Sequence, residues 1–118
     1  MSLQQELLSL EKGFWSGGPD FYRNNLDDQC LVAFTEMASV MSKEQVASTV
    51  KDEKRWKNVD LKQKGLLELD NGVAMLTYEA DCERANGEHY AALVSSGYVK
   101  RDGKWKMAFH QQTPLTEH

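Results

Sequence analysis

Three turn dipeptides in the second half of the chain constrain its fold more than any other feature. They are Asn71-Gly72, Asn86-Gly87 and Asp102-Gly103. Each is typical of a type I′ turn, because both central residues need a positive φ that Asn, Asp and Gly tolerate best. Three such turns in succession predict a four-stranded antiparallel meander, with strands over residues 59–69, 73–84, 88–101 and 104–112. Strands of this length must twist and bend, so one side of the sheet becomes concave.

Side-chain alternation then assigns the two faces of the sheet, if each turn has two loop residues. In this register Tyr78 lies opposite Gly65 and Ser95, and Ser95 lies opposite His110. The neighbouring rows on the same face are mainly apolar or small: Gln63, Ala80, Leu93 and Gln112 on one side, and Leu67, Leu76, Gly97 and Ala108 on the other. Because these residues leave space above the sheet, we expect a ligand-sized cavity there and name this surface the pocket face.

The opposite face of the predicted sheet has a charged zone and an apolar zone. Lys64 falls opposite Glu79 and Lys62 opposite Asp81, as expected of solvated cross-strand ion pairs. The apolar zone consists of Met75, Tyr98, Trp105, Met107 and Phe109. An exposed apolar patch on a small protein is usually an interface, so we expect a homodimer that packs the outer sheet faces together.

Helical patterns and one strand are predicted in the first half. Leu3, Leu7, Leu10 and Phe14 form one amphipathic stripe, and Ser2 with Gln5 can close a capping box before it. Asp20 is expected to cap a short second helix, and a strand is predicted over 29–35. Ser42 and Gln45 repeat the capping-box spacing before a third helix, which is expected to end near Glu53. The run 51–55 alternates in charge and is interpreted as a solvated helix end.

Composition excludes several classes of protein. The chain has 118 residues, which fits one domain (1–118), and its formal net charge of −4 makes nucleic acid an unexpected partner. No apolar run is long enough for a membrane span, so a cytoplasmic protein is expected. Cys30 and Cys82 form no C-x-x-C pair and are expected to be buried thiols. No metal-ligand spacing and no cofactor motif is found.

Several segments together are familiar from a known family. They are the helix start Ser42-Lys43-Glu44-Gln45, the strand segment Tyr78-Glu79-Ala80 and, above all, the segment SSGYVKRDGKWKMAFHQQTP over 95–114. The chain resembles domain of unknown function 4440, in the nuclear transport factor 2-like superfamily with ketosteroid isomerase and the polyketide cyclases. The resemblance implies a cone-shaped, cystatin-like α+β fold: three N-terminal helices on a strongly curved antiparallel sheet, with a deep cavity and frequent homodimers. It transfers no reaction, because the superfamily's isomerase constellation, an Asp base with a Tyr and a protonated acid, cannot be matched here residue by residue.

Candidate site residues follow from the pocket face. His110 is the natural proton carrier and Tyr78 a hydrogen-bond donor to a carbonyl or oxyanion, although either could be a structural core residue. Gln63, Ser95 and Gln112 are candidate ligand contacts that could instead satisfy the backbone. No acidic residue falls on this face, so a Ser–His–Asp triad is not predicted. A bulge that turned Glu79 inward would make it a candidate base.

Two functions of different class remain. In the first, the domain binds a small apolar or carbonyl-containing molecule and, if it is an enzyme, catalyses an acid–base step of isomerase, cyclase or dehydratase type. In the second, side chains fill the cavity and the domain acts through sheet-mediated dimerisation. Cavity occupancy separates the two, since both predict a dimer.

Overall fold

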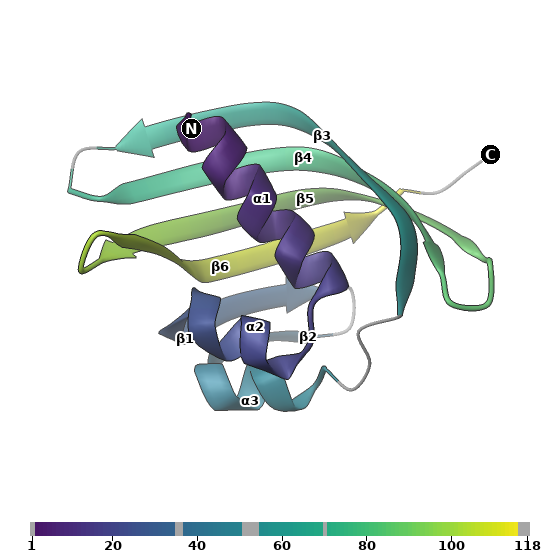
Figure 1. The fold of residues 1–118 in the computed structure, drawn as a ribbon, viewed down its shortest axis with the longest axis horizontal. Helices are drawn as coiled ribbons and strands as arrows, with labels where there is room; N and C mark the ends of the chain where they lie inside the picture. The colour runs from purple at the N-terminus through teal and green to yellow at the C-terminus, as the bar shows by residue number, and fades with distance from the viewer. Residues whose placement is uncertain (1, 35–36, 51–54, 70, 116–118) are drawn as a thin grey trace.

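The computed structural model describes residues 2–34, 37–50, 55–69 and 71–115. In these ranges the elements are α1 (Leu3–Ser16), α2 (Pro19–Asn25), β1 (Leu26–Phe34), β2 (Met37–Ser42), α3 (Lys43–Ser48), β3 (Trp56–Leu69), β4 (Val73–Arg84), β5 (His89–Arg101) and β6 (Lys104–Pro114). The six strands found there form one sheet in the order β2-β1-β6-β5-β4-β3 (Figure 1). The expected α+β class with helices on a curved sheet is confirmed.

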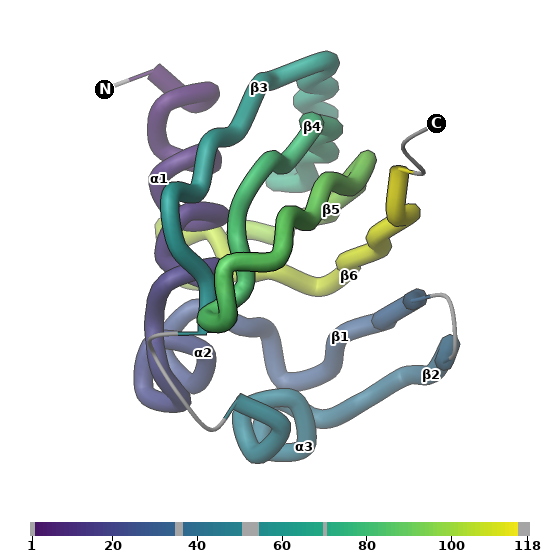
Figure 2. The backbone as a smooth tube through the Cα atoms, turned by 90° about the vertical axis from the view of Figure 1, so that its right-hand side faces the viewer, coloured from purple at the N-terminus to yellow at the C-terminus, as the bar shows by residue number. Residues whose placement is uncertain are grey.

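The helices lie on one face of the sheet, which we call the inner face. α1 crosses β3–β6, while α2 and α3 lie together beside β1 and β2 (Figure 1). Seen from the side, β1 and β2 lie below the other strands and above α3 (Figure 2). β2 was not predicted, and β1 pairs with β6 in parallel, so the sheet is not purely antiparallel as expected. No helix in the described ranges is long and apolar enough to cross a bilayer.

The predicted helix starts are largely confirmed. Both capping boxes form, Ser2 with Gln5 and Ser42 with Gln45, and each pairs side chain with backbone in both directions. Capping of α2 by Asp20 is wrong: Gly18 is the N-cap, and Pro19 takes the first helical position, where its missing N–H costs nothing. α3 ends at Ser48, earlier than expected, and the predicted end near residue 53 lies outside the described residues.

The hairpin loops differ from one another. Asp102 and Gly103 have φ of 52° and 80° and join Arg101 to its partner Lys104, which confirms a two-residue turn. Asn71 and Gly72 also have positive φ, but Leu69 pairs with Val73, one residue away from the expected register.

The β4–β5 loop departs furthest from the prediction. The amide of Arg84 donates to the carbonyl of Glu88, and the amide of Gly87 to the carbonyl of Arg84, both at 2.8 Å. Of the residues 85–87, Gly87 has a positive φ (89°), as in a three-residue loop that ends in a glycine bulge. The type I′ turn predicted for Asn86-Gly87 is therefore wrong.

This extra loop residue inverts the predicted faces of β5. Tyr78 pairs with Val94 rather than Ser95, so Ser96 and Tyr98 are buried on the inner face while Ser95 and Leu93 alternate to the outer face. The placement of Ser95 on the pocket face is therefore wrong, and so is that of Tyr98 in the outer apolar zone. One slipped position moves every side chain of a strand to the other side.

Two bulges restore the predicted faces further along the neighbouring strands. Tyr98 pairs with Met107 but Gly97 pairs with Phe109, so β6 changes face at Ala108. Trp105 and Met107, expected outside, are buried inside, whereas His110 and Gln112 lie on the inner face as predicted.

On β3 the pairing shifts between Gly65 and Gln63. Leu67 and Gly65 consequently share the outer face with Met75 and Thr77, contrary to the prediction, and Gln63 returns to the inner face opposite Tyr78. A bulge thus cancels a register error for every residue beyond it.

An apolar row crosses the outer face of the whole sheet. Its members pair in succession from β3 to β2: Leu67, Met75, Gly97, Phe109, Leu31 and Val40. Leu67, Met75, Leu31 and Val40 are 53%, 48%, 46% and 61% exposed. The charged zone beside it is real, but its partners are shifted: Lys62 lies opposite Glu79 and Asp60 opposite Asp81.

Candidate functional site: a buried carboxyl beside an apolar pocket

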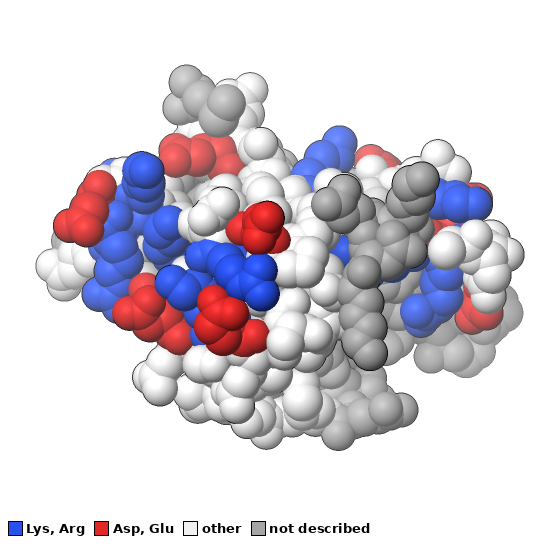
Figure 3. All heavy atoms as spheres, turned by 60° about the horizontal axis from the view of Figure 1, so that its bottom comes forward, with Lys and Arg blue, Asp and Glu red and all other residues white. Residues whose placement is uncertain are grey.

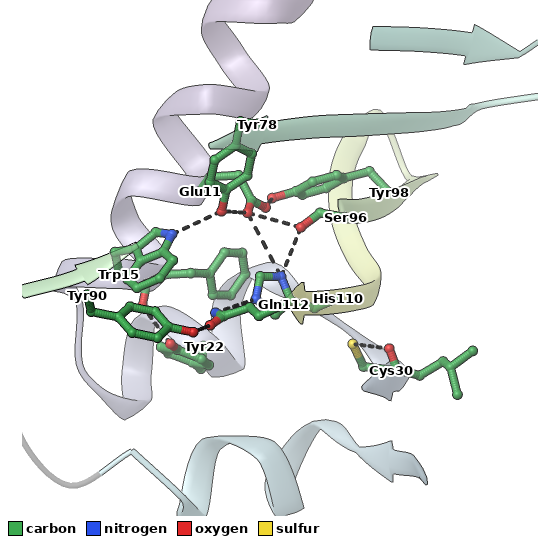
Figure 4. A network of polar contacts seen from close by, with 12 residues as sticks. Glu11, Trp15, Tyr22, Cys30, Tyr78, Tyr90, Ser96, Tyr98, His110 and Gln112 are labelled. Atoms are coloured by element: carbon green, nitrogen blue, oxygen red, sulfur yellow. Dashed lines mark hydrogen bonds and ion pairs between the residues drawn. The ribbon is translucent and has the colours of Figure 1, made fainter. Parts of the chain in front are cut away.

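A carboxyl group lies at the centre of the inner face. Glu11 sits in the third turn of α1, on the stripe that also carries Leu7, and it is fully buried. The hydroxyls of Tyr78, Tyr98 and Ser96 donate to its two oxygens, the last at 3.0 Å (Figure 4). Burying a carboxyl group without partners is very costly, so these three donors are what allow it there.

The network continues from Glu11 to the C-terminal strand. Ser96 Oγ lies 2.9 Å from His110 Nδ1, and His110 Nε2 lies 2.9 Å from the amide nitrogen of Gln112. Tyr90 donates to the Gln112 carbonyl oxygen at 2.9 Å. On the other side, the Trp15 indole N–H donates to the Tyr78 hydroxyl at 2.9 Å. One connected chain of hydrogen bonds therefore joins α1, β4, β5 and β6 (Figure 4).

Burial sets the charge states around Glu11. It raises the pKa of Tyr78 and of Tyr98 far above the ordinary tyrosine value, and the negative charge of Glu11 raises both further, so both remain protonated donors. Burial lowers the pKa of His110, and Glu11 partly offsets that effect. His110 is therefore a neutral imidazole at neutral pH.

An apolar pocket of about 290 Å³ opens beside His110, between β6 and the end of the molecule built by α2, α3, β1 and β2. Its apolar lining comprises Phe14, Leu26, Cys30, Val32, Phe34, Met37, Met41, Val46, Val50, Trp56 and Met107. Polar groups enter at five positions, which are Tyr22, Thr49, Arg55, His110 and Gln112. Such a hollow, apolar with a few polar groups, is the usual form of a small-molecule site.

The polar groups at the α2 side of the pocket are held by the protein itself. Arg55 donates to the carbonyl oxygens of Phe14 and Gly17 at 2.7 and 2.9 Å and to the Tyr22 hydroxyl at 2.9 Å. Tyr22 in turn donates to the Phe14 carbonyl at 2.5 Å. Arg55 thus fastens the end of α1 to the start of β3 and is not solvated as the charge alternation predicted. The rest of that predicted helix end, 51–54, lies outside the described residues.

The structure separates the five predicted site residues into three groups. His110 and Gln112 line the pocket. Tyr78 and Gln63 face inward but do not line it: the Tyr78 hydroxyl is engaged by Glu11 and Trp15, and Gln63 Oε1 is buried with no hydrogen-bond partner among the described residues. Ser95 faces the outer side of β5.

Glu11 and Ser96 are the residues that sequence reasoning missed. Glu11 follows Leu7 by four positions and precedes Phe14 by three, so the helical stripe placed it on the apolar face. A charged residue at such a position signals a buried polar site, because the carboxyl must find partners there. Ser96 was missed because the register of β5 was one residue out.

The two cysteine thiols are unreactive at neutral pH, and no metal-binding cluster is found among the described residues. Burial raises the pKa of the Cys30 thiol to about 12 and that of Cys82 to about 11, so neither is a thiolate nucleophile at neutral pH. Among the described residues, no three His, Cys, Asp or Glu side chains come close enough to hold a metal ion.

A second, open hollow is lined by charges that largely pair with one another. Arg101 donates two hydrogen bonds to Asp27 at 3.0 and 3.1 Å, and Lys43 lies 3.5 Å from Asp28. Figure 3 shows Lys and Arg interspersed with Asp and Glu on one face of the molecule. Among the described residues that line this hollow, positive side chains are largely balanced by acidic partners, which does not suit a phosphate backbone.

Comparison with known proteins shows the fold. No family model matches the chain, and no curated protein matches its sequence. Solved structures do match: an NTF2-like protein from Cytophaga hutchinsonii (TM-score 0.78, 15% identity, 98% of this chain and 100% of that chain), a proposed ketosteroid isomerase from Parabacteroides distasonis (0.77, 14%, 98% and 89%) and an NTF2-like protein of unknown function from Shewanella oneidensis (0.74, 16%, 94% and 98%). Identities this low speak for architecture rather than activity. The chain therefore has the NTF2-like fold, with a curved sheet closed by helices around the Glu11 network and the pocket.

Proposed function

We propose that the protein binds a small, mostly apolar molecule in the pocket, with the polar group of that molecule against His110 and Gln112. The observation that carries the proposal is the contrast inside the hollow: its walls are largely aliphatic, aromatic and thioether side chains, while His110 and Gln112 lie on β6 at the end of a buried hydrogen-bond network. Apolar walls supply affinity and a few polar groups fix orientation. Likeness in fold to a proposed ketosteroid isomerase supports the same proposal.

If the bound molecule reacts, an acid–base step on a carbonyl compound suits the site. His110 would carry the proton, since a neutral imidazole can accept one near neutral pH. Tyr78 would act on His110 from a distance, through Glu11, rather than on the ligand itself. We also propose that the chain is a member of the domain of unknown function 4440 family, and the closing segment 95–114 supports this.

Ligand screening with matched histidine variants tests the binding proposal. A library of small apolar alcohols, phenols and ketones is added to the protein, and the thermal midpoint is measured, because a ligand that binds the folded state raises apparent stability. We expect hits that lose their shift in His110→Ala and keep it in His89→Ala, whose exposed side chain contacts Asp81 on the outer face. Hits that are insensitive to His110→Ala would place binding elsewhere.

A second candidate function is self-association through the outer face. The observation that favours it is the apolar row from Leu67 to Val40, which spans all the strands described and carries no charge. A second copy related by a two-fold axis can cover this row with the same row. Sedimentation of the wild type should show a dimer at micromolar concentration and Met75→Lys a monomer, whereas Glu79→Lys, in the charged zone, should leave the mass unchanged. A monomeric wild type would contradict this candidate.

A further inference from the structure

The hydrogen bonds around His110 have a direction that can be derived from their donors. Gln112 accepts the Tyr90 hydroxyl at its carbonyl oxygen, so its amide nitrogen is the atom that faces His110 Nε2 at 2.9 Å. In this orientation the amide nitrogen donates and Nε2 accepts, so Nε2 carries no proton. A neutral imidazole then has its proton on Nδ1. If the Tyr90 hydroxyl accepted instead, the amide would turn over and the bond would reverse.

The Glu11 end of the network fixes this assignment. Ser96 donates its hydroxyl hydrogen to Glu11 Oε1 at 3.0 Å, so its oxygen accepts from Nδ1–H at 2.9 Å. The Glu11 carboxyl also accepts from Tyr78 and Tyr98, so it ends every chain of donors in the cluster. Glu11 and Ser96 are 0% and 1% exposed, so water does not compete for these hydrogen bonds and cannot change which group donates. The direction therefore runs from Gln112 through His110 and Ser96 to Glu11.

We propose that Glu11, through Ser96, is the positioning residue that holds His110 in its Nδ1–H form, and that the pocket consequently selects ligands bearing a hydrogen-bond donor: an alcohol, a phenol or an enol. The proposal deepens the binding function proposed above and rests on it for the ligand class. The ligand preference follows from the geometry, because an imidazole protonated on Nδ1 can only accept a hydrogen bond at Nε2 and therefore binds a donor there.

The ligand class follows from what replaces Gln112. The Nε2 lone pair and the Gln112 amide are both on the pocket lining and bind each other. A ligand hydroxyl can enter between them, donating to Nε2 and accepting the released amide N–H. An ether or a ketone of the same shape can accept the amide proton but leaves Nε2 without a donor. Sites built around such a bond discriminate strongly against the analogue that lacks it.

Imidazole NMR tests the positioning step without any ligand. Protein with ¹⁵N-labelled histidine is measured at pH 8, and His110 is assigned with His110→Asn. We expect the ¹⁵N shifts of His110 to show a protonated Nδ1. Ser96→Ala removes the acceptor of Nδ1–H and lets the Gln112 amide turn its oxygen to Nε2, so it should convert His110 to the Nε2–H form that predominates in free histidine. Ser95→Ala is the matched control: it is the preceding residue, on the outer face, and should change nothing.

Three results would overturn the positioning role. They are an Nε2–H form in the wild type, an unchanged form in folded Ser96→Ala, and an unchanged form in folded Glu11→Ala. Because Glu11→Ala weakens folding, its spectrum is read only under conditions where amide shifts far from the cluster match the wild type. Ser96→Ala keeps the test decisive by itself.

A matched ligand pair tests the selectivity. 2-Naphthol and 2-methoxynaphthalene share shape and differ in the donor, and their affinities are measured from the methyl shifts of pocket residues. We expect naphthol to bind the wild type at least about tenfold more tightly, and the preference to shrink to near unity in Ser96→Ala. Equal affinities in the wild type would reject the selectivity and leave the binding function intact. Failure of both probes to bind would count against the proposed binding function, while the ligand-free spectra would still decide the role of Glu11.

Discussion

The inner face of the sheet is filled at one end and hollow at the other. Beneath α1, the Glu11 cluster and fully buried side chains such as Leu7 and Leu76 occupy the space between helix and strands. Beside α2 and α3, the same sheet face leaves a pocket of about 290 Å³. The two ends meet at His110, which belongs to both. Structural rigidity and ligand space are thus divided along one surface, and the polar network joins them.

The largest expected effect comes from removing the acceptor at the filled end. Glu11→Ala leaves the hydroxyls of Tyr78, Tyr98 and Ser96 buried without their acceptor, and we expect a loss of about 3–5 kcal/mol in the free energy of unfolding. Urea unfolding followed by tryptophan fluorescence measures it. Glu6→Ala, on the exposed side of the same helix, should cost less than about 0.5 kcal/mol. Equal losses in the two variants would show that the cluster contributes nothing special.

Added volume should separate the two ends more directly. Ala80→Leu inserts three carbons into the filled end, where Ala80 is fully buried, and we expect a loss of about 1–3 kcal/mol. Val46→Phe adds a similar volume on the pocket wall, where it can enter the hollow, and should change stability by less than about 1 kcal/mol while abolishing probe binding. If Val46→Phe destabilises as much as Ala80→Leu, the pocket is not open in solution.

Single hydroxyls offer a finer comparison. Tyr98→Phe removes a buried donor to Glu11 and should cost about 1.5 kcal/mol, as expected for a hydrogen bond to a charged group. Tyr90→Phe removes a donor to Gln112 from a half-buried ring, where water can replace it, and should cost less than about 0.5 kcal/mol. The same urea titrations measure both. A larger loss of stability in Tyr90→Phe than in Tyr98→Phe would show that the stronger hydrogen bonds lie at the pocket end.

The smallest expected effect is a pH dependence at the point where the two ends meet. The folded pKa of His110 is lowered from about 6.5, so as pH falls below that value the unfolded chain takes up a proton that the folded protein does not. Stability should therefore fall as pH decreases from about 6.5 through the lower folded pKa, by at most about 1.4 kcal/mol per pH unit. The difference in unfolding free energy between wild type and His110→Asn isolates this contribution. A flat difference from pH 7 to pH 5 would contradict the lowered pKa.

The fold could be predicted from local signals because these signals are short. The two capping boxes act within four residues, and the three turn dipeptides mark the hairpins, so the strand order in the meander and the starts of α1 and α3 were predicted. β2 was missed because MASVMS has neither alternating polarity nor charge, and its pairing depends on β1.

The site was predicted only in part, because the face of each strand residue is assigned by counting residues from the turn. Each added loop residue or bulge inverts the count, and His110 and Gln112 were placed correctly because the β4–β5 loop and the bulge at Ala108 cancel. Ser95 lies between these two irregularities, where the one-residue shift is not cancelled, so it was assigned to the wrong face. Glu11 could have been found from its helical position, but two of its three partners, Ser96 and Tyr98, lie on β5, whose faces had been inverted.

Glu11 is separated from Tyr78, Ser96 and Tyr98 by 67, 85 and 87 positions along the chain. Contacts between such distant segments close late in folding, because the intervening chain must first lose its freedom. A molecule in which α1 has not yet docked would have an incomplete cluster and an unsupported imidazole. Occupancy of the pocket would then report that the first helix and the last strand have met, because a ligand would bind only after that contact has formed.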